Sequence, residues 1–373
     1  MPPEVLARFL PAWHGIGAES SSIDRLADVV FQLQGLALPA SVIERDVLSA
    51  RVRDYRPRLL DELVSMGEVV WAGRGSLGQQ DGRVALIHGR LREQLARRPS
   101  FFPELYTAAG GGDTDAVLDA LWDLVWAGEV TNDTFAPLRA IGGGRSRRPT
   151  RPGRPRLPRL THPRAVGRWS LTADLRAAPP APTERLHALA GVLLQRHGVL
   201  TREAVLAEGT PGGFAGVYPV LRAMEEAGRI RRGYFIEGLG ASQFALPGAV
   251  DRLRGLREPD GRIVALAATD PANPYGIVIP WLESAGRPAR AAGAYVVLES
   301  GELKLFLERG GRSLLTFGSV DVGHLAALAT AAGAVGKVEL LKVDGASIHD
   351  SGLQPALREA GFKSSPRGMV LLA

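Results

Sequence analysis

The sequence predicts an α+β fold, with tandem winged-helix modules followed by a small antiparallel β-barrel and a terminal helix–strand unit. Three observations predict it. One helix–glycine–strand signature occurs three times, the last third of the chain alternates apolar and polar residues as strands do, and the chain has 373 residues. Because single domains cluster at roughly 100–150 residues, this length suits two to four modules.

The repeated signature consists of two apolar residues three positions apart, a glycine four positions further on, and a short β-prone run. Apolar residues at that spacing place a buried stripe on a helix, and glycine tolerates the left-handed conformation just past the helix end. Each copy therefore predicts a helix that stops at the glycine and leads into a strand or hairpin. The copies are Leu60, Leu63 and Gly67, then Leu121, Leu124 and Gly128, then Leu221, Met224 and Gly228.

The third copy gives the clearest module. Thr183 is a candidate N-cap for a first helix, Thr201 opens a short second helix after Gly198, and residues 214–227 form the third helix. Residues 229–246 then supply a β-wing. Three helices and a β-wing make a winged helix.

Beyond Gly261 the apolar pattern changes to that of short strands. Residues 303–308 alternate leucine with lysine, phenylalanine and glutamate, which predicts a strand with one buried face. Several short antiparallel strands favour a small barrel or half-barrel. The expected strands are 263–268, 275–281, 294–299, 303–308, 313–317 and 337–343, with a helix near 320–332, a last helix at 353–360 and a last strand at 368–372.

These patterns divide the chain into six parts. They are winged-helix module 1 (1–92), winged-helix module 2 (93–141), an Arg/Pro-rich linker (142–182), winged-helix module 3 (183–256), the β-barrel with its inserted helix (257–347), and the C-terminal helix and strand (348–373).

Positive charge is concentrated in the linker. Residues 142–178 hold ten arginines and one acid, a balance of +9, whereas the whole chain carries +6 and the remainder therefore about −3. Only four lysines occur, so the positive charge is almost entirely guanidinium, which suits forked contacts with phosphate. A high-GC genome would produce the same arginine bias, and a soluble spacer would carry the same composition, so both alternatives stay open.

Nucleic-acid contacts are predicted in the linker and in module 3. In a winged helix the third helix can enter the major groove while the wing touches phosphates or the minor groove. For module 2, with Glu129 and Asp133 after its helix, packing or oligomerisation is the better prediction. The predicted DNA-binding residues are Arg145, Arg147, Arg148, Arg151, Arg154, Arg156, Arg222, Arg229, Arg231, Arg232 and Tyr234.

The composition excludes several other classes of function. Hydrophobic residues make up 45% and charged residues 23%, as in a globular chain, and no apolar run approaches the roughly 20 residues of a membrane helix. We therefore expect no membrane partner. With no cysteine and no visible secretory signal, a cytoplasmic location is expected. The scattered histidines lack ligand spacing, so no metal and no cofactor are expected.

Catalytic candidates are few. The fragment Gly333–Lys337 lacks the spacing of a phosphate-binding loop, so this chain is not expected to hydrolyse ATP. Gln32 and Gln34 are alternate residues at a predicted helix end, where two carboxamides can position a water or read a base edge. Whether the chain is itself an enzyme is left open by its residues.

The chain resembles the C-terminal region of the large helicase-related (Lhr) family of superfamily 2 DNA helicases. The resemblance spans nearly the whole chain. It rests on PEVLARFLPAWHG (3–15), QLQG (32–35), ARVRDYRPRLLDELVSMGEVVWAG (50–73), RRGYFIEGLGASQFALPGAVDRLR (231–254), DPANPYG (270–276) and AAGAYVVLESGELKLFLERGGRSLLTF (291–317).

This resemblance implies a DNA-repair role, an ATPase core N-terminal to this chain, and self-assembly into homo-oligomers such as tetramers. The region is also similar to winged-helix crosslink-repair DNA glycosylases, whose Gln-hydrophobic-Gln motif Gln32 and Gln34 match. Family members carry a terminal acidic catalytic residue as well, and this chain has no Asp or Glu after Glu359. The leading hypothesis is therefore a non-ATPase domain that binds DNA and oligomerises. A glycosylase acting through Gln32 and Gln34, or a pure scaffold, are the alternatives.

Overall fold

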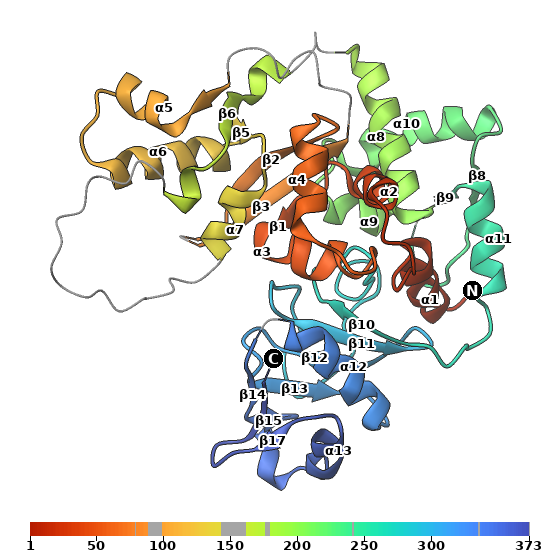
Figure 1. Cartoon of the computed structure of the whole chain (residues 1–373). Coiled ribbons are helices and arrows are strands. Elements are labelled where there is room, and N and C mark those ends of the chain that lie inside the picture. Colours follow the sequence, from red (N-terminus) through yellow and green to blue (C-terminus); the bar gives the residue numbers. More distant parts are fainter. Residues whose placement is uncertain are drawn as a thin grey trace, which may run out of the picture. The chain divides into compact units, whose positions relative to one another are not determined.

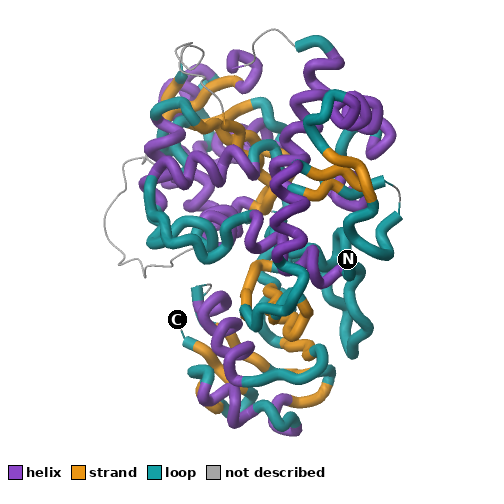
Figure 2. The backbone as a smooth tube through the Cα atoms, turned by 90° about the vertical axis from the view of Figure 1, so that its right-hand side faces the viewer, coloured by secondary structure: helices purple, strands orange, loops and turns teal. Residues whose placement is uncertain are grey.

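The computed structural model describes residues 1–78, 80–88, 99–142, 162–175, 180–240, 242–334 and 336–372. The chain forms two compact units. Unit 1 comprises Met1–Ala18, Arg45–Arg51 and Pro180–Ala373, and unit 2 comprises Glu19–Glu44 and Val52–Pro179. Helices and short strands alternate through both units (Figures 1 and 2). Among the described helices none is both long and apolar enough to cross a membrane.

Unit 2 contains two small three-stranded sheets with helices packed on them. The strand orders are β1-β3-β2 and β4-β6-β5. The elements are α2 (Ile23–Leu33), β1 (Leu38–Pro39), α3 (Ala40–Val42), α4 (Pro57–Ser65), β2 (Val69–Ser76), β3 (Gly82–His88), β4 (Ser100–Phe101), α5 (Phe102–Ala108), α6 (Thr114–Trp126), β5 (Val130–Asn132), α7 (Ala136–Gly142), η2 (Pro163–Ala165), β6 (Arg168–Leu171) and η3 (Thr172–Leu175), and the π-helical η1 (Ile43–Leu48) crosses from unit 2 into unit 1.

Unit 1 contains the other helices and sheets. Its sheets have the orders β7-β9-β8, β10-β11-β12-β13-β15-β16 and β14-β18-β17. The elements are α1 (Pro3–Trp13), α8 (Pro182–His197), β7 (Val199–Leu200), α9 (Arg202–Ala207), α10 (Gly213–Glu226), β8 (Arg231–Gly233), β9 (Gln243–Ala245), α11 (Pro247–Gly255), β10 (Ile263–Ala267), β11 (Tyr295–Glu299), β12 (Glu302–Leu307), β13 (Ser313–Thr316), α12 (Val322–Gly333), β14 (Val338–Leu340), β15 (Lys342–Val343), β16 (Ala346–Ser347), η4 (Ile348–Asp350), α13 (Gln354–Glu359), β17 (Lys363–Ser364) and β18 (Met369–Leu371).

The helix–glycine–strand prediction is confirmed in all three copies. Gly67, Gly128 and Gly228 have φ angles of 72°, 78° and 72°, in the left-handed region that a side chain disfavours. The amide of the next residue bonds back to the carbonyl five positions earlier in each case, at 3.0, 3.0 and 2.9 Å. That bond and the left-handed glycine together end the helix as a Schellman turn does.

The second copy continues differently from the other two. β5 is followed by α7 rather than by a returning strand, and its partner is β6, with Thr131 opposite Ser170. β6 lies within the range predicted to be an extended linker, so residues 168–171 are instead the central strand of a sheet. Trp169 on β6 is buried and packs edge-on against Trp122 of α6. Trp169 therefore anchors this segment to α6.

The third copy forms a winged helix whose core includes the distant helix α1. Val5, Leu6, Phe9 and Leu10 of α1 are buried in one cluster with residues of α8, α9, α10 and β9. Thr201 caps α9, as predicted, by accepting a bond from the amide of Ala204 at 3.2 Å. The hairpin of β8 and β9 follows α10 as the wing.

The strands beyond Gly261 form an open sheet rather than the predicted barrel. In the described chain β10 and β16 are the two edges, and no pairing joins them. The strands are mostly antiparallel, and β13 and β15 are parallel. Closing a barrel requires every strand to find a neighbour on both sides. Here β15 and β16 have only two residues each, too short to extend the sheet back to β10.

The predicted single buried face of this sheet is also wrong, since both faces are covered. Leu305 and Leu307 face a core that includes α12, whereas Leu303 and Phe306 belong to a second core. The adjacent Val297 and Leu298 of β11 pair with Leu305 and Leu303, so Lys304 is an extra residue in β12 and displaces the alternation there. A bulge of this kind moves a side chain to the other face, which the leucine spacing alone could not show.

Residues 275–281 form turns instead of the predicted strand. Asp270 pairs with the fully buried Arg51 at 2.7 and 2.8 Å. Arg290 donates to the carbonyls of Asp270, Asn273 and Tyr275 at 2.8–3.0 Å. Burial lowers the pKa of Arg290 to about 10, and the nearby Asp270 works against that shift. One of these bonds occupies the carbonyl of Tyr275, the first residue of the predicted strand.

Candidate nucleic-acid interface

The wing of the third winged helix carries the predicted DNA-binding side chains at its surface. Gly228 ends α10, Ile230 is buried, and the chain then enters β8, where Arg231 and Arg232 are exposed. β8 pairs with β9, which places Arg232 opposite the buried Phe244. Cross-strand partners share a face of the hairpin, so Arg232 is the exposed member of a pair whose other member, Phe244, lies in the core.

A buried amide fixes the shape of the wing loop. Gln243 is fully buried on β9, and its Oε1 accepts bonds from the amides of Phe235 and Ile236, both at 2.9 Å. Its Nε2 donates to the carbonyl of Ile236 at 2.8 Å. These bonds fix the backbone just after Tyr234. The tyrosine therefore has a defined attachment point on the loop, although 78% of it is exposed.

Two of the wing arginines, Arg229 and Arg232, have a polar neighbour. Arg229 Nη1 lies 3.4 Å from His187 Nε2 on α8. Arg232 lies 3.8 Å from Glu225 and donates to the hydroxyl of Tyr218 at 3.5 Å. These distances are long for hydrogen bonds, so both guanidinium groups are held weakly and can turn to a phosphate.

Helix α10 offers little with which to read base edges. Its exposed stripe is Ala215, Pro219, Arg222 and Glu226. Arg222, the predicted contact on this helix, is committed to Glu226 one turn on, at 2.8 Å. The structure therefore brings Arg229, Arg231, Arg232 and Tyr234 together on and beside the wing and leaves Arg222 on the helix.

The other predicted contacts cannot be placed in this way. Arg145, Arg147, Arg148, Arg151, Arg154 and Arg156 lie outside the described residues. Arg164 and Arg168, which also contribute to the charge of that stretch, are described. They pair with Asp119 at 3.5 Å and with Asp133 at 2.6 Å. Part of the arginine-rich stretch thus has partners within unit 2.

The two candidate catalytic glutamines lie at the C-terminal end of α2. Gln32 is in the last turn, and Gln34 is the first residue beyond the helix, with ψ of 135°. Both side chains are half-buried. The amide of Gly35 donates to the carbonyl of Leu86 at 2.7 Å and so ties this helix end to β3. Phe31 beside them is 46% exposed and meets His88 edge-on, with ring centroids 5.7 Å apart.

Many arginines outside the wing serve the fold by binding backbone carbonyls. Arg252 bonds the carbonyl of Ala12 in the last turn of α1 at 2.7 Å, and Arg262 bonds that of Ile16, just after the helix, at 2.6 Å. Arg8 bonds those of Leu256 and Ser300 at 2.8 and 2.5 Å. Cations at a helix C-terminus also complement its dipole. Arginine richness in this chain is therefore partly structural, which the composition alone could not distinguish from phosphate binding.

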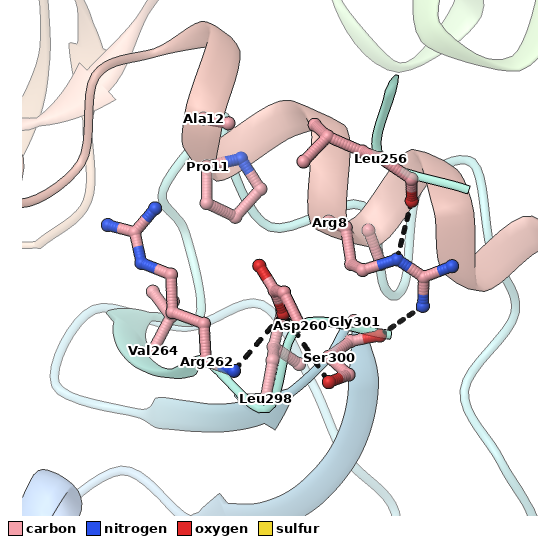
Figure 3. Close-up of a pocket in the computed structure, with 11 residues that line it drawn as sticks. Arg8, Pro11, Ala12, Leu256, Asp260, Arg262, Val264, Leu298, Ser300 and Gly301 are labelled. Carbon is pink, nitrogen blue, oxygen red and sulfur yellow. Dashed lines mark hydrogen bonds between the residues drawn. The ribbon is translucent and has the colours of Figure 1, made fainter. Parts of the chain in front are cut away.

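The cavity beside Arg8 is too small for a ligand. It lies between α1 and the start of β10 and has a volume of about 30 Å³ (Figure 3). Asp260 points into it and accepts bonds from the amide of Arg262 at 3.1 Å and the hydroxyl of Ser300 at 3.4 Å. Such a volume holds about one water molecule.

A second ionic cluster, missed from the sequence, lies within unit 2. Arg139 of α7 bonds both oxygens of Glu44, at 2.6 and 2.9 Å, and Asp61 of α4 at 2.7 Å. Tyr55 donates to the same Glu44 at 2.6 Å. Burial alone would raise the pKa of Asp61, but the bonds from Arg139, Thr134 and Phe135 outweigh it and lower the pKa. With every carboxylate oxygen engaged, the cluster fastens α7 to α4 and has no oxygen to spare for activating water.

A third ionic cluster lies within the third winged helix, between the end of α8 and the end of α9. Glu208 pairs with Arg196 and lies 2.7 Å from His197 Nε2. Burial opposes ionisation there, yet the bond from His197 and the charge of Arg196 lower the pKa of Glu208 to about 2. Arg196 and His197 are adjacent in the sequence, but the sequence does not show that Glu208 lies beside them. The cluster is therefore recognised only in the structure.

Two segments match family models for winged-helix domains of large helicase-related proteins. They are residues 1–89 and 179–264. The chain is 43% identical over 425 residues to the "Lhr helicase/ probable uracil glycosylase" of Mycolicibacterium smegmatis, covering 99% of this chain and 28% of that protein. It is 37% identical over 408 residues to the "Lhr helicase/uracil glycosylase" of Escherichia coli K12, covering 93% of this chain and 26% of that protein.

The chain thus spans about a quarter of the length of the curated relatives it matches. Among solved structures it is similar to the Streptomyces sahachiroi DNA glycosylase AlkZ, with a TM-score of 0.47 and 14% sequence identity. That similarity covers 92% of this chain and 99% of the other.

Proposed function

We propose, from the premise that this chain carries winged-helix domains of the large helicase-related family and resembles its C-terminal region, that it is a DNA-binding, non-ATPase part of a DNA-repair helicase. The helicase core belongs to the rest of the parent polypeptide. The observation that carries the proposal is the group of exposed side chains at the wing, Arg229, Arg231, Arg232 and Tyr234.

Charge and position support the wing as the contact. Three arginines and an exposed tyrosine occur within six residues, on and beside a hairpin that projects from a rigid core. Wings of winged helices contact phosphates or the minor groove. Arginine is suited to that role because its forked donors match two phosphate oxygens. The linker arginines, from Arg145 to Arg156, are proposed as a second contact that follows the phosphate backbone.

The test is the salt dependence of DNA binding by the whole chain. Fluorescence anisotropy with a labelled oligonucleotide should show an affinity that falls steeply with salt. Replacing Arg229, Arg231 and Arg232 together by Ser should weaken binding and reduce the slope of log K against log salt by about 2–3, roughly one for each lost phosphate contact.

A separate variant changes the six linker arginines to Ser, and Arg83→Ser, on the surface of β3 in unit 2, is the matched control. A DNA affinity that does not change with salt, or that is unchanged by both sets of substitutions, would rule out the proposal.

The six module boundaries predicted from the sequence and the formation of homo-oligomers are proposals too. Light scattering on the same preparations measures the mass, and a monomer at all concentrations would contradict self-assembly.

A DNA glycosylase is the second candidate function, because both relatives are named as uracil glycosylases. Gln32 and Gln34 at the end of α2 would receive the extruded base, and the exposed Phe31 would fill its place in the stack. Incubation with uracil-containing DNA should leave abasic sites. Gln34→Ala should abolish them, whereas the surface change Gln80→Ala should not. Equal activity in both variants would remove the glutamines from the mechanism.

A further inference from the structure

An aromatic hollow lies beside the wing in the third winged helix. Its volume is about 600 Å³, and it opens at the surface between α9 and the start of α10. Phe214, Tyr218 and Leu206 supply its apolar walls, and Arg202 lies at its rim. Leu206 is 53% exposed and adds an apolar side chain to the two rings at this part of the surface.

The two aromatic rings are held rigidly. Phe214 and Tyr218 lie one helical turn apart, with centroids separated by 5.8 Å. Both rings also pack on Phe244, which is fully buried on β9, at 6.4 and 5.8 Å. Because the buried ring fixes them from beneath, their outer sides form a preformed platform rather than a mobile surface.

The hollow is connected to the basic wing. Arg232 of β8 reaches the Tyr218 hydroxyl at 3.5 Å, so one guanidinium group lies at the border of the hollow. Tyr234 follows β8 directly, two residues after Arg232, and is exposed. The hollow, Arg232 at its border and Tyr234 after the strand therefore place aromatic and cationic side chains in alternation at this end of the third winged helix.

We propose that this surface binds an unpaired nucleic-acid strand, with one base stacked on Phe214 and Tyr218, the backbone at Arg202 and Arg232, and a second base on Tyr234. Rigid aromatic rings interleaved with cations are the features by which proteins bind single strands without reading sequence. The inference rests on the proposed DNA binding and deepens it, because it names the strand form that the site takes.

The same geometry argues against the duplex as the preferred ligand. A recognition helix that reads the major groove presents polar side chains to base edges. The exposed stripe of α10 offers Ala215 and Pro219, and its single arginine is paired with Glu226. An apolar hollow also cannot bind the outside of a duplex by stacking, because the bases of a duplex are stacked on one another and their faces are covered. An unpaired strand exposes the faces of its bases, which can stack in the apolar hollow. Its binding does not require a helix that reads base edges.

The test compares labelled single-stranded thymidine oligonucleotide with a duplex of the same length, on the full chain at fixed salt. We expect the single strand to bind at least tenfold more tightly. Tyr234→Ala and Tyr218→Leu should each weaken single-strand binding by about fivefold or more, as the loss of one stacked base does. Duplex affinity should not change, Tyr218→Phe should restore binding, and Phe101→Ala, an exposed aromatic residue of unit 2, should leave it unchanged.

A second measurement keeps the proposal testable if Tyr218→Leu does not fold. Photocrosslinking with iodouracil oligonucleotide, followed by peptide mapping, should place crosslinks at Tyr218 and Tyr234. Equal or tighter duplex binding that is insensitive to these variants overturns the single-strand site and leaves DNA binding intact. No binding of either form means that the proposed function itself has failed. A concentration-dependent dimer that Tyr218→Leu abolishes, with DNA affinity unchanged, assigns the hollow to a second copy of the chain.

Discussion

The second and third copies of the repeated signature share one turn and use the strand after it in opposite ways. In the second copy, β5 is buried throughout, with Val130, Thr131 and Asn132 between 2% and 5% exposed. Thr131 bonds the carbonyl of Trp71 on β2, and Trp71 Nε1 bonds the carbonyl of Thr134 at 3.1 Å. In the third copy, β8 begins with two exposed arginines.

This difference shows where the function of a repeated module is determined. The helix, the left-handed glycine and the backward bond are the same, so they encode only a strand that leaves at a fixed angle. The residues placed on that strand decide whether it packs on a neighbouring sheet or remains accessible to a ligand. The strand β5 packs against β2 within unit 2, whereas β8 in the wing of the third copy is exposed.

The largest effect is expected where β2 meets α6. Gly73 on β2 has no room for a side chain, because a Cβ there would overlap the carbonyl oxygen of Val125. Gly73→Leu should therefore lower the free energy of unfolding of unit 2 by about 3 kcal/mol. Urea unfolding followed by tryptophan fluorescence suits this test, since four of the six tryptophans, at 71, 122, 126 and 169, belong to unit 2.

The matched control is Gly240→Ala in the wing loop of module 3. A Cβ at Gly240 meets nothing within 4 Å, so the free energy of unfolding should change by less than about 0.5 kcal/mol. Equal effects of the two substitutions would mean that the buried and exposed strands do not differ as described.

The next effect concerns the ionic cluster of unit 2. Arg139→Leu leaves Glu44 and Asp61 without their cation, and because all three side chains keep some contact with water, a loss of about 2 kcal/mol is expected at pH 7. The pKa of Asp61 is lowered in the folded protein, so the stabilisation is full above its ordinary value of 3.8 and is lost as the pH falls below it.

The difference between Arg139→Leu and the parent chain should therefore shrink in acid. Arg83→Leu on the surface of β3 should change stability little at either pH. A difference that stays constant from pH 7 to pH 3 would show that packing of the Arg139 stem, rather than its charge, stabilises unit 2.

A smaller effect is expected from the core beneath the exposed wing. Burial, together with the charges of Arg51, His197 and Arg196, lowers the pKa of His14 well below 6.5. The unfolded chain binds the proton more readily, so stability is full above pH 6.5 and falls as the pH drops below it, by up to about 1.4 kcal/mol per pH unit. Measured between pH 7.5 and 5.5, His14→Gln should flatten this dependence, whereas the exposed His349→Gln should not.

The smallest effect on stability is expected at the wing itself. Arg231→Ser should leave the free energy of unfolding within about 0.5 kcal/mol of the parent, because the side chain is exposed. The same substitution should reduce DNA affinity in the anisotropy assay. A clear loss of thermal stability without loss of affinity would reverse the comparison and assign the wing a structural role.

Local patterns predicted the local structure well. The three glycines and the Thr201 cap depend on neighbours in sequence, and each appears as expected. The open sheet was missed because its topology depends on which strands pair and on a bulge in β12. Leucine spacing carries no information about either.

The candidate site was predicted only in part, for a similar reason. Wing residues such as Arg231 and Tyr234 follow a recognisable turn, so their exposure could be expected. Phe214 and Tyr218 were not among the predicted contacts, because nothing in the sequence shows that both rings pack on Phe244. The pairing of Arg51 with Asp270 joins residues 219 positions apart, which no local pattern contains.

Helix α1 has a consequence for how the chain folds during synthesis. Phe9 and its neighbours on α1 are buried against α8, β9 and the elements between them, whose first core residue is Ala190. At ~5–20 residues per second, a ribosome needs roughly 10–40 seconds to make the intervening stretch. For that time the apolar face of α1 is without its partner, while most of the sequence of unit 2 is already available to fold. The third winged helix therefore completes its core with a helix that is synthesised well before α8, and truncation after residue 179 would leave the apolar face of α1 exposed.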